Sequence, residues 1–108
     1  MSNKLKTVKV MVPVKGLRYR LSDRERSDLR DSANDKGVVC ELELEPENEY
    51  DPRAIKVLAI GKHIGYVARP VNVPLYRTIK AGLKIKTCKM VEYDKRTDEG
   101  RLEVLLYK

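Results

Sequence analysis

Residues 37–68, GVVCELELEPENEYDPRAIKVLAIGKHIGYVA, contain three apolar runs whose spacing decides the fold. In the first run, apolar residues at the even positions of 38–44 alternate with glutamates, as in a strand with one buried face. The second run begins at Ala54 and is apolar on both faces, which predicts a central strand. It turns at Gly61 into the third run, so residues 54–68 predict a β-hairpin.

The segments on either side continue this pattern of short strands. Valines at the even positions of 8–14 predict a half-buried strand, and Pro13 predicts that this strand lies at an edge or carries a bulge. Residues 83–94 and 101–108 predict two further strands. The apolar positions change parity within 83–94, and a bulge at residues 86–87 would explain the change.

Two segments have helical features. Residues 72–82, NVPLYRTIKAG, predict a helix that Asn72 caps and Gly82 ends. Residues 22–35 are almost wholly charged and begin with a serine three residues before a glutamate, which fits a capping box. For this second segment the residues leave a short solvated helix and a disordered loop equally open.

The predicted fold class is mainly β. Five to six strands and one short α-helix are typical of a small OB-like or SH3-like β-barrel. The 108 residues match one ordinary domain, so we expect residues 1–108 to form a single domain. The chain lacks Phe and Trp, so its core must be aliphatic.

Composition excludes several classes of function. No run approaches the roughly 18 apolar residues of a membrane span, and the N-terminal residues do not resemble a cleaved leader, so we expect a soluble, cytoplasmic protein. Cys40 and Cys88 are the only cysteines, and His63 is the only histidine. This set has no zinc-site spacing, so we expect no metal and no cofactor. We expect two reduced core thiols, although the sequence leaves a disulfide between them open.

The net charge of +7 is unevenly distributed. Residues 62–96 contain nine basic residues and only two acids, whereas the rest of the chain has 14 of each sign. Such a surface suits a polyanion, with nucleic acid as the first choice. An anionic membrane is the second choice, but no basic amphipathic anchor is present, so no membrane partner is expected.

Three motifs resemble the HIRAN domain family: GLRYR at 16–20, EPENEYDPRAIKV at 45–57 and GKHIGYVAR at 61–69. This module occurs at the N-terminus of the helicase-like transcription factor that remodels replication forks, and as a free-standing protein in bacteria and phages. The resemblance covers roughly residues 8 to 85. It implies an OB-like barrel that binds the 3′-hydroxyl end of single-stranded DNA in a repair or replication context, with a helicase or repair protein as a possible partner in trans.

The resemblance also implies which residues bind nucleic acid. Five positions match the motifs of the fork-remodelling member: Arg18, Tyr19, Asn48, Tyr50 and Asp51. Tyr66 and Arg69 fall at corresponding positions with a different residue type, and Tyr93 is a further candidate aromatic residue. The chain departs from that member at Arg20, Glu49, Tyr66 and Arg69, which stand where it has an aromatic residue, a proline, a histidine and a lysine. RNA as the ligand and the oligomeric state are left open.

Elementary chemistry gives these residue types the same role. Stacking on a tyrosine contributes on the order of 1 to 3 kcal/mol per base without requiring a particular base. Arg18 and Arg69 can offer forked donors to phosphate oxygens. The Asp51 carboxylate accepts a hydrogen bond from a terminal hydroxyl and repels a continuing phosphate, so it selects a strand that ends there. The acidic turn is thus predicted to sense ends within a basic groove.

Other interpretations of the same residues remain open. Asp51 and Asn48 are common turn formers, and the tyrosines suit the edge of a core. A small metal-dependent nuclease, with Asp51 paired to Glu47 or Glu49, is less favoured because no nuclease motif is present, and no nucleotide-binding loop suggests an ATPase. We therefore expect no enzyme activity. A non-catalytic protein-interaction module that uses a strand edge at Val8–Val14 is the other alternative.

Overall fold

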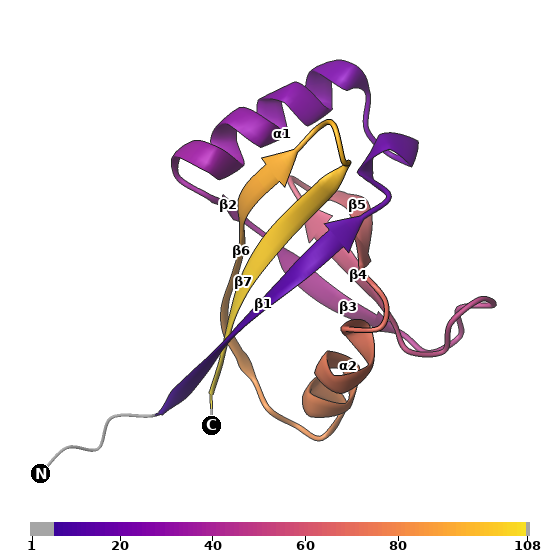
Figure 1. Cartoon of the computed structure of the whole chain (residues 1–108). Helices are drawn as coiled ribbons and strands as arrows, with labels where there is room; N and C mark the ends of the chain where they lie inside the picture. Colours follow the sequence, from indigo (N-terminus) through magenta and orange to yellow (C-terminus); the bar gives the residue numbers. More distant parts are fainter. Residues whose placement is uncertain (1–5, 108) are drawn as a thin grey trace, which may run out of the picture.

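Seven antiparallel strands form one sheet that curls into a nearly closed barrel (Figure 1). The structure, a computed structural model, describes residues 6–107. The sheet order is β2-β6-β7-β1-β5-β4-β3. The strands are β1 (Thr7–Lys15), β2 (Val38–Val39), β3 (Glu41–Glu45), β4 (Ala54–Ala59), β5 (Lys62–Val67), β6 (Ile85–Asp94) and β7 (Glu99–Tyr107). The barrel-like fold class is confirmed, with seven strands in place of the predicted five to six.

The two edge strands of this sheet, β2 and β3, are consecutive in the sequence. β2 pairs with β6, and β3, which follows it directly, pairs with β4. Between them the Cys40 N–H donates to the Cys88 carbonyl at 2.9 Å. The alternating run 38–45 is therefore two strands with different neighbours, since the chain changes partner at Cys40.

Strand β6 is irregular at two places. Its register with β7 shifts between Ile85 and Thr87, which confirms the predicted bulge. It shifts again between Met90 and Glu92, a second bulge that was not predicted. Because each bulge changes which side chains face inward, the second one turns Tyr93 into the core, where it is 1% exposed.

Pro13 was expected to mark an edge strand or a bulge, and the edge strand is wrong. The β1–β7 register also runs through Pro13 without a shift. β1 lies between β7 and β5 in the sheet. Its ladder with β5 contains only Val14 and Lys15, and the Pro13 carbonyl accepts from the Ala68 N–H on that same side at 2.9 Å. The missing N–H of Pro13 also points to that side, so the β7 ladder does not lose a hydrogen bond.

Residues 6–107 contain two α-helices and a short 3-10 helix, where one helix was predicted and a second was left open. α1 (Asp23–Asp35) begins with the capping box of Ser22 and Glu25, so the charged segment is a helix. It packs on β6 through Leu29 and Ala33. The 3-10 helix η1 (Leu17–Tyr19) follows β1.

Helix α2 (Asn72–Lys80) confirms the predicted helix but not its predicted cap. The N-cap is Val71, and no side chain caps the helix. Asn72 is buried, and its amide is used elsewhere. Gly82 lies just beyond the helix with φ +106°, as expected for a helix stop.

The β4–β5 hairpin confirms the prediction for residues 54–68. Its two-residue turn consists of Ile60 (φ 48°) and Gly61 (φ 74°). Positive φ at both positions is the type I′ pattern that matches the twist of a hairpin. The β-branched Ile60 is strained in this conformation.

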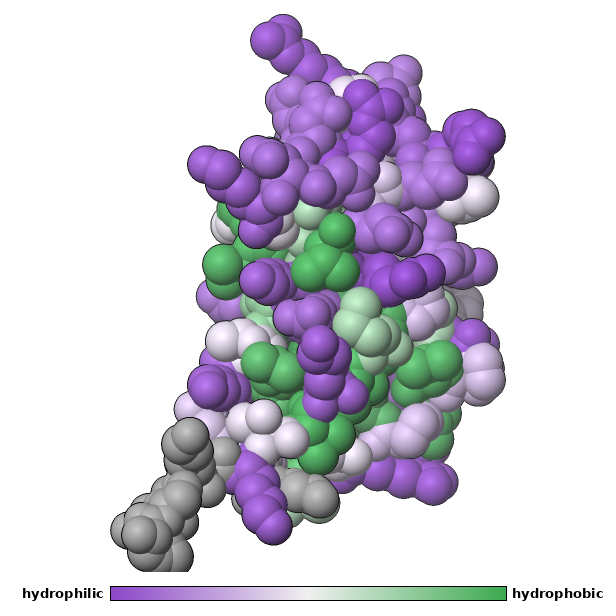
Figure 2. Space-filling view, turned by 60° about the vertical axis from the view of Figure 1, so that its left-hand side comes forward, coloured by the Kyte–Doolittle hydropathy of each residue, from purple (hydrophilic) through white to green (hydrophobic). Residues whose placement is uncertain are grey.

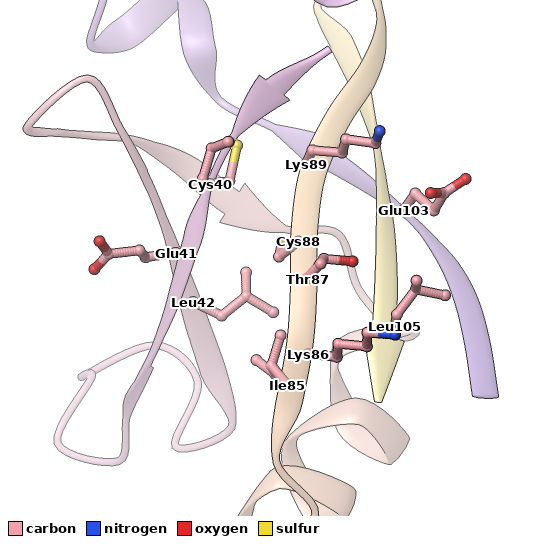
Figure 3. Close-up of a pocket in the computed structure, with 11 residues that line it drawn as sticks. Cys40, Glu41, Leu42, Ile85, Lys86, Thr87, Cys88, Lys89, Glu103 and Leu105 are labelled. Carbon is pink, nitrogen blue, oxygen red and sulfur yellow. The ribbon is translucent and has the colours of Figure 1, made fainter. Parts of the chain in front are cut away.

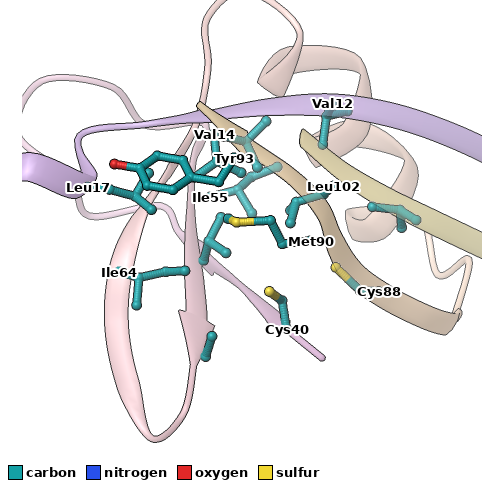
Figure 4. Packing of buried hydrophobic residues seen from close by; sticks show 14 of the residues in the cluster. Val12, Val14, Leu17, Cys40, Ile55, Ile64, Cys88, Met90, Tyr93 and Leu102 are labelled. Carbon is teal, nitrogen blue, oxygen red and sulfur yellow. The ribbon is translucent and has the colours of Figure 1, made fainter. Parts of the chain in front are cut away.

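The core is one continuous cluster of mainly aliphatic side chains with Met90 and Tyr93 among them (Figure 4). Cys40 and Cys88 lie in this cluster as free thiols, as predicted. Burial raises the pKa of Cys40 to about 11 and that of Cys88 to about 12. Both thiols are therefore protonated at neutral pH and poor nucleophiles.

The surface differs between the two ends of the molecule. Figure 2 shows hydrophilic residues over the upper part, where α1 lies, and apolar side chains grouped lower on the face that it brings forward. Val39 (78% exposed) and Ile60 (68% exposed) are among the exposed large apolar residues. Within residues 6–107, neither helix has the length and apolar character of a membrane span.

Candidate nucleic-acid interface

The acidic turn between β3 and β4 is held in shape by Asn48. Its Oδ1 accepts from the backbone N–H of Tyr50 at 2.8 Å and of Asp51 at 3.0 Å. This arrangement leaves the Tyr50 ring 87% exposed. Asn48 therefore orders the turn, and Tyr50 presents a free aromatic face to solvent.

Glu45 connects this turn to the barrel. Its Oε1 accepts from Asn48 Nδ2 at 2.6 Å and from the Tyr66 hydroxyl at 2.8 Å, while its Oε2 lies 3.1 Å from Lys56 Nζ. The bonds from Asn48 and Tyr66, followed by that of Lys56, lower the pKa of Glu45 to about 2. Glu45 thus remains a carboxylate at all ordinary pH values and fixes two of the predicted site residues.

Glu45 was not predicted as a site residue, although the alternation of its strand contains a signal. In the β3–β4–β5 ladder, Glu43 pairs with Lys56, and Lys56 pairs with Tyr66. Glu45 is two residues from Glu43, so it must lie on the same face as Lys56 and Tyr66.

The Asp51 carboxylate is bound from three sides. Its Oδ1 accepts from the Arg53 backbone N–H at 2.9 Å. Its Oδ2 accepts from Asn72 Nδ2 at 2.9 Å and lies 3.5 Å from Arg69 Nε. Asn72 was predicted only as a helix cap, and nothing local in the sequence distinguishes a capping asparagine from one that reaches back 21 residues to the turn.

Tyr66 lies between charged and aromatic neighbours. The Arg20 guanidinium carbon is 5.5 Å from its ring centroid, a cation–π distance. His63 meets the ring edge-on, with centroids 4.7 Å apart and an interplanar angle of 84°. Burial, followed by the nearby Arg20 charge, lowers the pKa of His63, so this half-buried imidazole is neutral at pH 7. His63 therefore supports the Tyr66 ring.

Five of the eight predicted residues share one hollow of about 280 Å³. It is lined by Asn48, Tyr50, Asp51, Tyr66 and Arg69 together with Ala54 and Val67. These residues come from the turn and the first residue of β4 (48–54) and from the end of β5 and the connection that follows it (66–69), so the fold unites two separate segments. An acid, a guanidinium group and two tyrosines border the same space.

The other three predicted residues lie elsewhere. Tyr93 is in the core, where its hydroxyl donates to Asp98 Oδ1 at 2.7 Å, and burial raises its pKa to about 12. Its expected role in the binding surface is not compatible with that position. The backbone N–H of Arg18 donates to the other oxygen of Asp98 at 3.1 Å, and its Nε lies 3.5 Å from it. Tyr19 in η1 is 85% exposed, but it does not line the hollow.

A larger hollow of about 750 Å³ lies where the sheet is not fully closed (Figure 3). Its walls include Leu42 of β3, Ile85 and Cys88 of β6, and Leu105 of β7. It contains no aromatic ring and none of the predicted site residues. Its position follows from the change of partner at Cys40, which leaves β3 and the first half of β6 unpaired with each other.

The charges around the smaller hollow have definite partners. Within residues 6–107, no group of three or more His, Cys, Asp or Glu side chains is placed to hold a metal ion. The carboxylates of Asp51 and Glu45 are each held by a basic side chain, Arg69 and Lys56. The basic side chains at this site are therefore balanced by carboxylates of the protein itself.

Comparison with known proteins identifies the family and the fold. The HIRAN domain family matches residues 8–106. The crystal structure of the HIRAN domain of human HLTF is similar, with a TM-score of 0.69 and 19% identity, covering 94% of this chain and 78% of that one. A protein from Lactobacillus plantarum has a TM-score of 0.67 and 23% identity, covering 94% and 97%. Because both identities are below 25%, these similarities establish the fold alone. No functionally curated protein matches the sequence.

Proposed function

Because the chain belongs to the HIRAN domain family, a family of nucleic-acid-binding modules, we propose that it binds single-stranded DNA at a free 3′-hydroxyl end. A module of this kind suits DNA repair or replication, where it would act beside a helicase or repair enzyme in trans. The proposal is for binding without catalysis: the two carboxylates nearest the hollow are held in bonds within the protein, and His63 supports a ring.

The observation that carries the proposal is the shared hollow. Asp51, Arg69, Tyr50 and Tyr66 border one space of about 280 Å³, although Asp51 and Arg69 are 18 positions apart. The Asp51 side chain is only 17% exposed, whereas the Arg69 side chain is 74% exposed. A group that enters the hollow therefore meets a fixed carboxylate and a guanidinium group that is free to move.

This arrangement accounts for a preference for ends. A terminal hydroxyl can donate to Asp51, which keeps unused lone pairs beside its three present donors. A phosphate at the same place would bring two negative charges together in a partly desolvated site. The preceding phosphate of the strand suits the Arg69 guanidinium, whose fork matches its oxygens.

The tyrosines supply affinity that does not depend on the base sequence of the bound strand. Tyr50 is almost fully exposed and offers a stacking platform worth about 1 to 3 kcal/mol per base. Tyr19 offers a second one, and Arg20 links its segment to Tyr66. Tyr66 is less available because its hydroxyl is bound to Glu45 and one neighbour is Arg20.

Polarisation titrations of a short labelled oligonucleotide, with either a 3′ hydroxyl or a 3′ phosphate, test the end preference. We expect the wild type to favour the hydroxyl end and Asp51→Asn to lose about tenfold or more of that preference, since a hydrogen bond to a charged group is lost. Glu49→Gln is the matched control, because it removes an acid of the same turn that does not line the hollow. Equal affinity of the wild type for both ends would contradict the end preference.

Arg69→Ala should act differently. It removes a phosphate contact, so both oligonucleotides should bind more weakly by a similar factor of about ten. Arg53→Ala is its control, since Arg53 is an exposed residue of the turn that does not line the hollow. A loss confined to the hydroxyl-ended ligand would show that Arg69 does not contact phosphate.

A further inference from the structure

Asn72 and Arg69 hold the same oxygen of Asp51 in different ways. Asn72 Nδ2 donates to Asp51 Oδ2 at 2.9 Å, and Arg69 Nε lies 3.5 Å from that atom. The Arg69 side chain is 74% exposed, and its contact is longer than a good hydrogen bond. Arg69 can therefore leave Asp51 at little cost when a phosphate competes for it.

Asn72 cannot leave in the same way. It is 1% exposed and is the first residue of α2. Its Nδ2 also donates to the Arg53 carbonyl at 2.8 Å, and its backbone N–H donates to the Ala68 carbonyl at 3.1 Å. The side chain is thus fixed between the turn and the start of the helix.

The orientation of the Asn72 amide is also determined. Both acceptors, the carboxylate of Asp51 and the carbonyl of Arg53, face Nδ2, so the opposite rotamer would set Oδ1 against two oxygens. The buried Oδ1 has no partner among the described residues. A buried unpaired acceptor is unfavourable, and an apolar side chain would avoid it. What the asparagine contributes here is therefore its pair of donor bonds to the turn.

We propose, on the basis of the proposed function, that Asn72 is the positioning residue that sets the discrimination between a 3′-hydroxyl and a 3′-phosphate end. When the phosphate of a bound strand draws Arg69 away, Asn72 and the Arg53 N–H keep the Asp51 carboxylate in place at the hollow. Without Asn72, the carboxylate follows Arg69 or turns to solvent. The site then still binds the strand but no longer distinguishes a hydroxyl from a phosphate.

The test compares 3′-hydroxyl and 3′-phosphate oligonucleotides on Asn72→Ala. We expect the ratio of the two dissociation constants to fall by about tenfold or more, while the affinity for the phosphate-ended strand changes by less than about threefold. Asn34→Ala is the control, because it also removes an amide that bonds a distant part of the chain, the Tyr93 backbone at 3.2 and 3.5 Å, and Tyr93 does not line the hollow. Thermal unfolding of both variants records any loss of stability.

Asn72→Asp gives a second readout that a purely structural role would not change. The charged groups that face this position are Asp51 of the turn and Arg69 of the β5–α2 connection. Two carboxyl groups at hydrogen-bond distance share a proton, which raises the pKa of one of them. The hydroxyl preference of Asn72→Asp relative to that of the wild type should therefore return as the pH falls from about 8 to about 5. Measuring the wild type at each pH corrects for the terminal phosphate, whose own second pKa of about 6 lies in the same window.

The outcomes separate the two proposals. A wild-type ratio in Asn72→Ala, or a ratio in Asn72→Asp that equals that of the wild type at every pH, together with loss of the ratio in Asp51→Asn, overturns the role of Asn72 and leaves the proposed function intact. If Asn72→Ala does not fold, the nearly isosteric Asn72→Asp decides the matter. If the wild type does not distinguish the two ends, both proposals fail.

Discussion

At the scale of single residues, the site depends on side chains that a ligand does not need to touch. Glu45 holds Asn48 and Tyr66, Asn48 orders the turn, and Asn72 holds Asp51. The exposed groups, Tyr50 and Arg69, are therefore presented by a network of buried and half-buried amides and carboxylates. Such a network makes the position of Asp51 a property of the folded barrel.

Glu45 provides a pH-dependent test of this network. Its folded-state pKa is about 2, compared with an ordinary value of 4.5, because Asn48 and Tyr66 donate to the carboxylate. A depressed pKa means that the carboxylate stabilises the fold above pH 4.5 and that this contribution is lost as the pH falls towards 2. Glu45→Gln should be less stable at pH 7 by about 1 to 2 kcal/mol and should lose less stability over that acid window.

Thermal unfolding of the wild type and Glu45→Gln between these pH values measures the difference. Glu43→Gln is the control, because Glu43 lies two positions away on the same strand and contacts only Lys56, at 3.6 Å. If the stability curves of the wild type and Glu45→Gln stayed parallel below pH 4.5, the carboxylate would not be held as described.

At the scale of elements, the close approach of β5 to β1 explains the second glycine of the GKHIGYVAR motif. A Cβ on Gly65 would lie 2.7 Å from the Lys15 carbonyl oxygen and 3.1 Å from Val14 Cγ1. Neither strand can move away freely, since the next residue, Tyr66, pairs with Lys15. Gly65 therefore allows β1 and β5 to join the two halves of the barrel beside the candidate site.

Gly65→Ala should consequently destabilise the protein by about 2 to 3 kcal/mol in urea unfolding. Gly100→Ala is the comparison, because its added Cβ would lie 2.7 Å from Met90 Cε, the end of a flexible side chain. We expect the Gly100 variant to lose only about 1 kcal/mol. The opposite ranking would mean that the backbone contact at Gly65 relaxes easily.

Regular alternation made much of the fold predictable, and irregular features limited the rest. The hairpin 54–68, the helix after Val71 and the inward position of Cys40 follow from periodicity. The second bulge in β6 does not follow from periodicity, because Tyr93 is equally plausible as an exposed aromatic residue until the register shift is known. Asn72 was misinterpreted because its partner lies far away in the sequence.

At the scale of the whole molecule, the excess positive charge lies outside the candidate site. Lys62, Arg69 and Arg96 each have an acidic partner. The ion pairs found within residues 6–107 leave out five basic residues of the 77–89 segment: Arg77, Lys80, Lys84, Lys86 and Lys89. This segment runs from the last turns of α2 into β6. We therefore expect the long-range attraction for a polyanion to come from other residues than the proposed discrimination at Asp51.

The central claim is that the hollow beside Asp51 receives the end of a strand. The most direct measurement is an NMR titration of backbone amides with a short oligonucleotide that ends in a 3′ hydroxyl, repeated with a 3′ phosphate. We predict the largest shifts at residues 48–53 and 66–69 for the hydroxyl-ended strand, and much smaller shifts there for the phosphate-ended strand. Shifts confined to residues 77–89 and identical for both strands would contradict the claim.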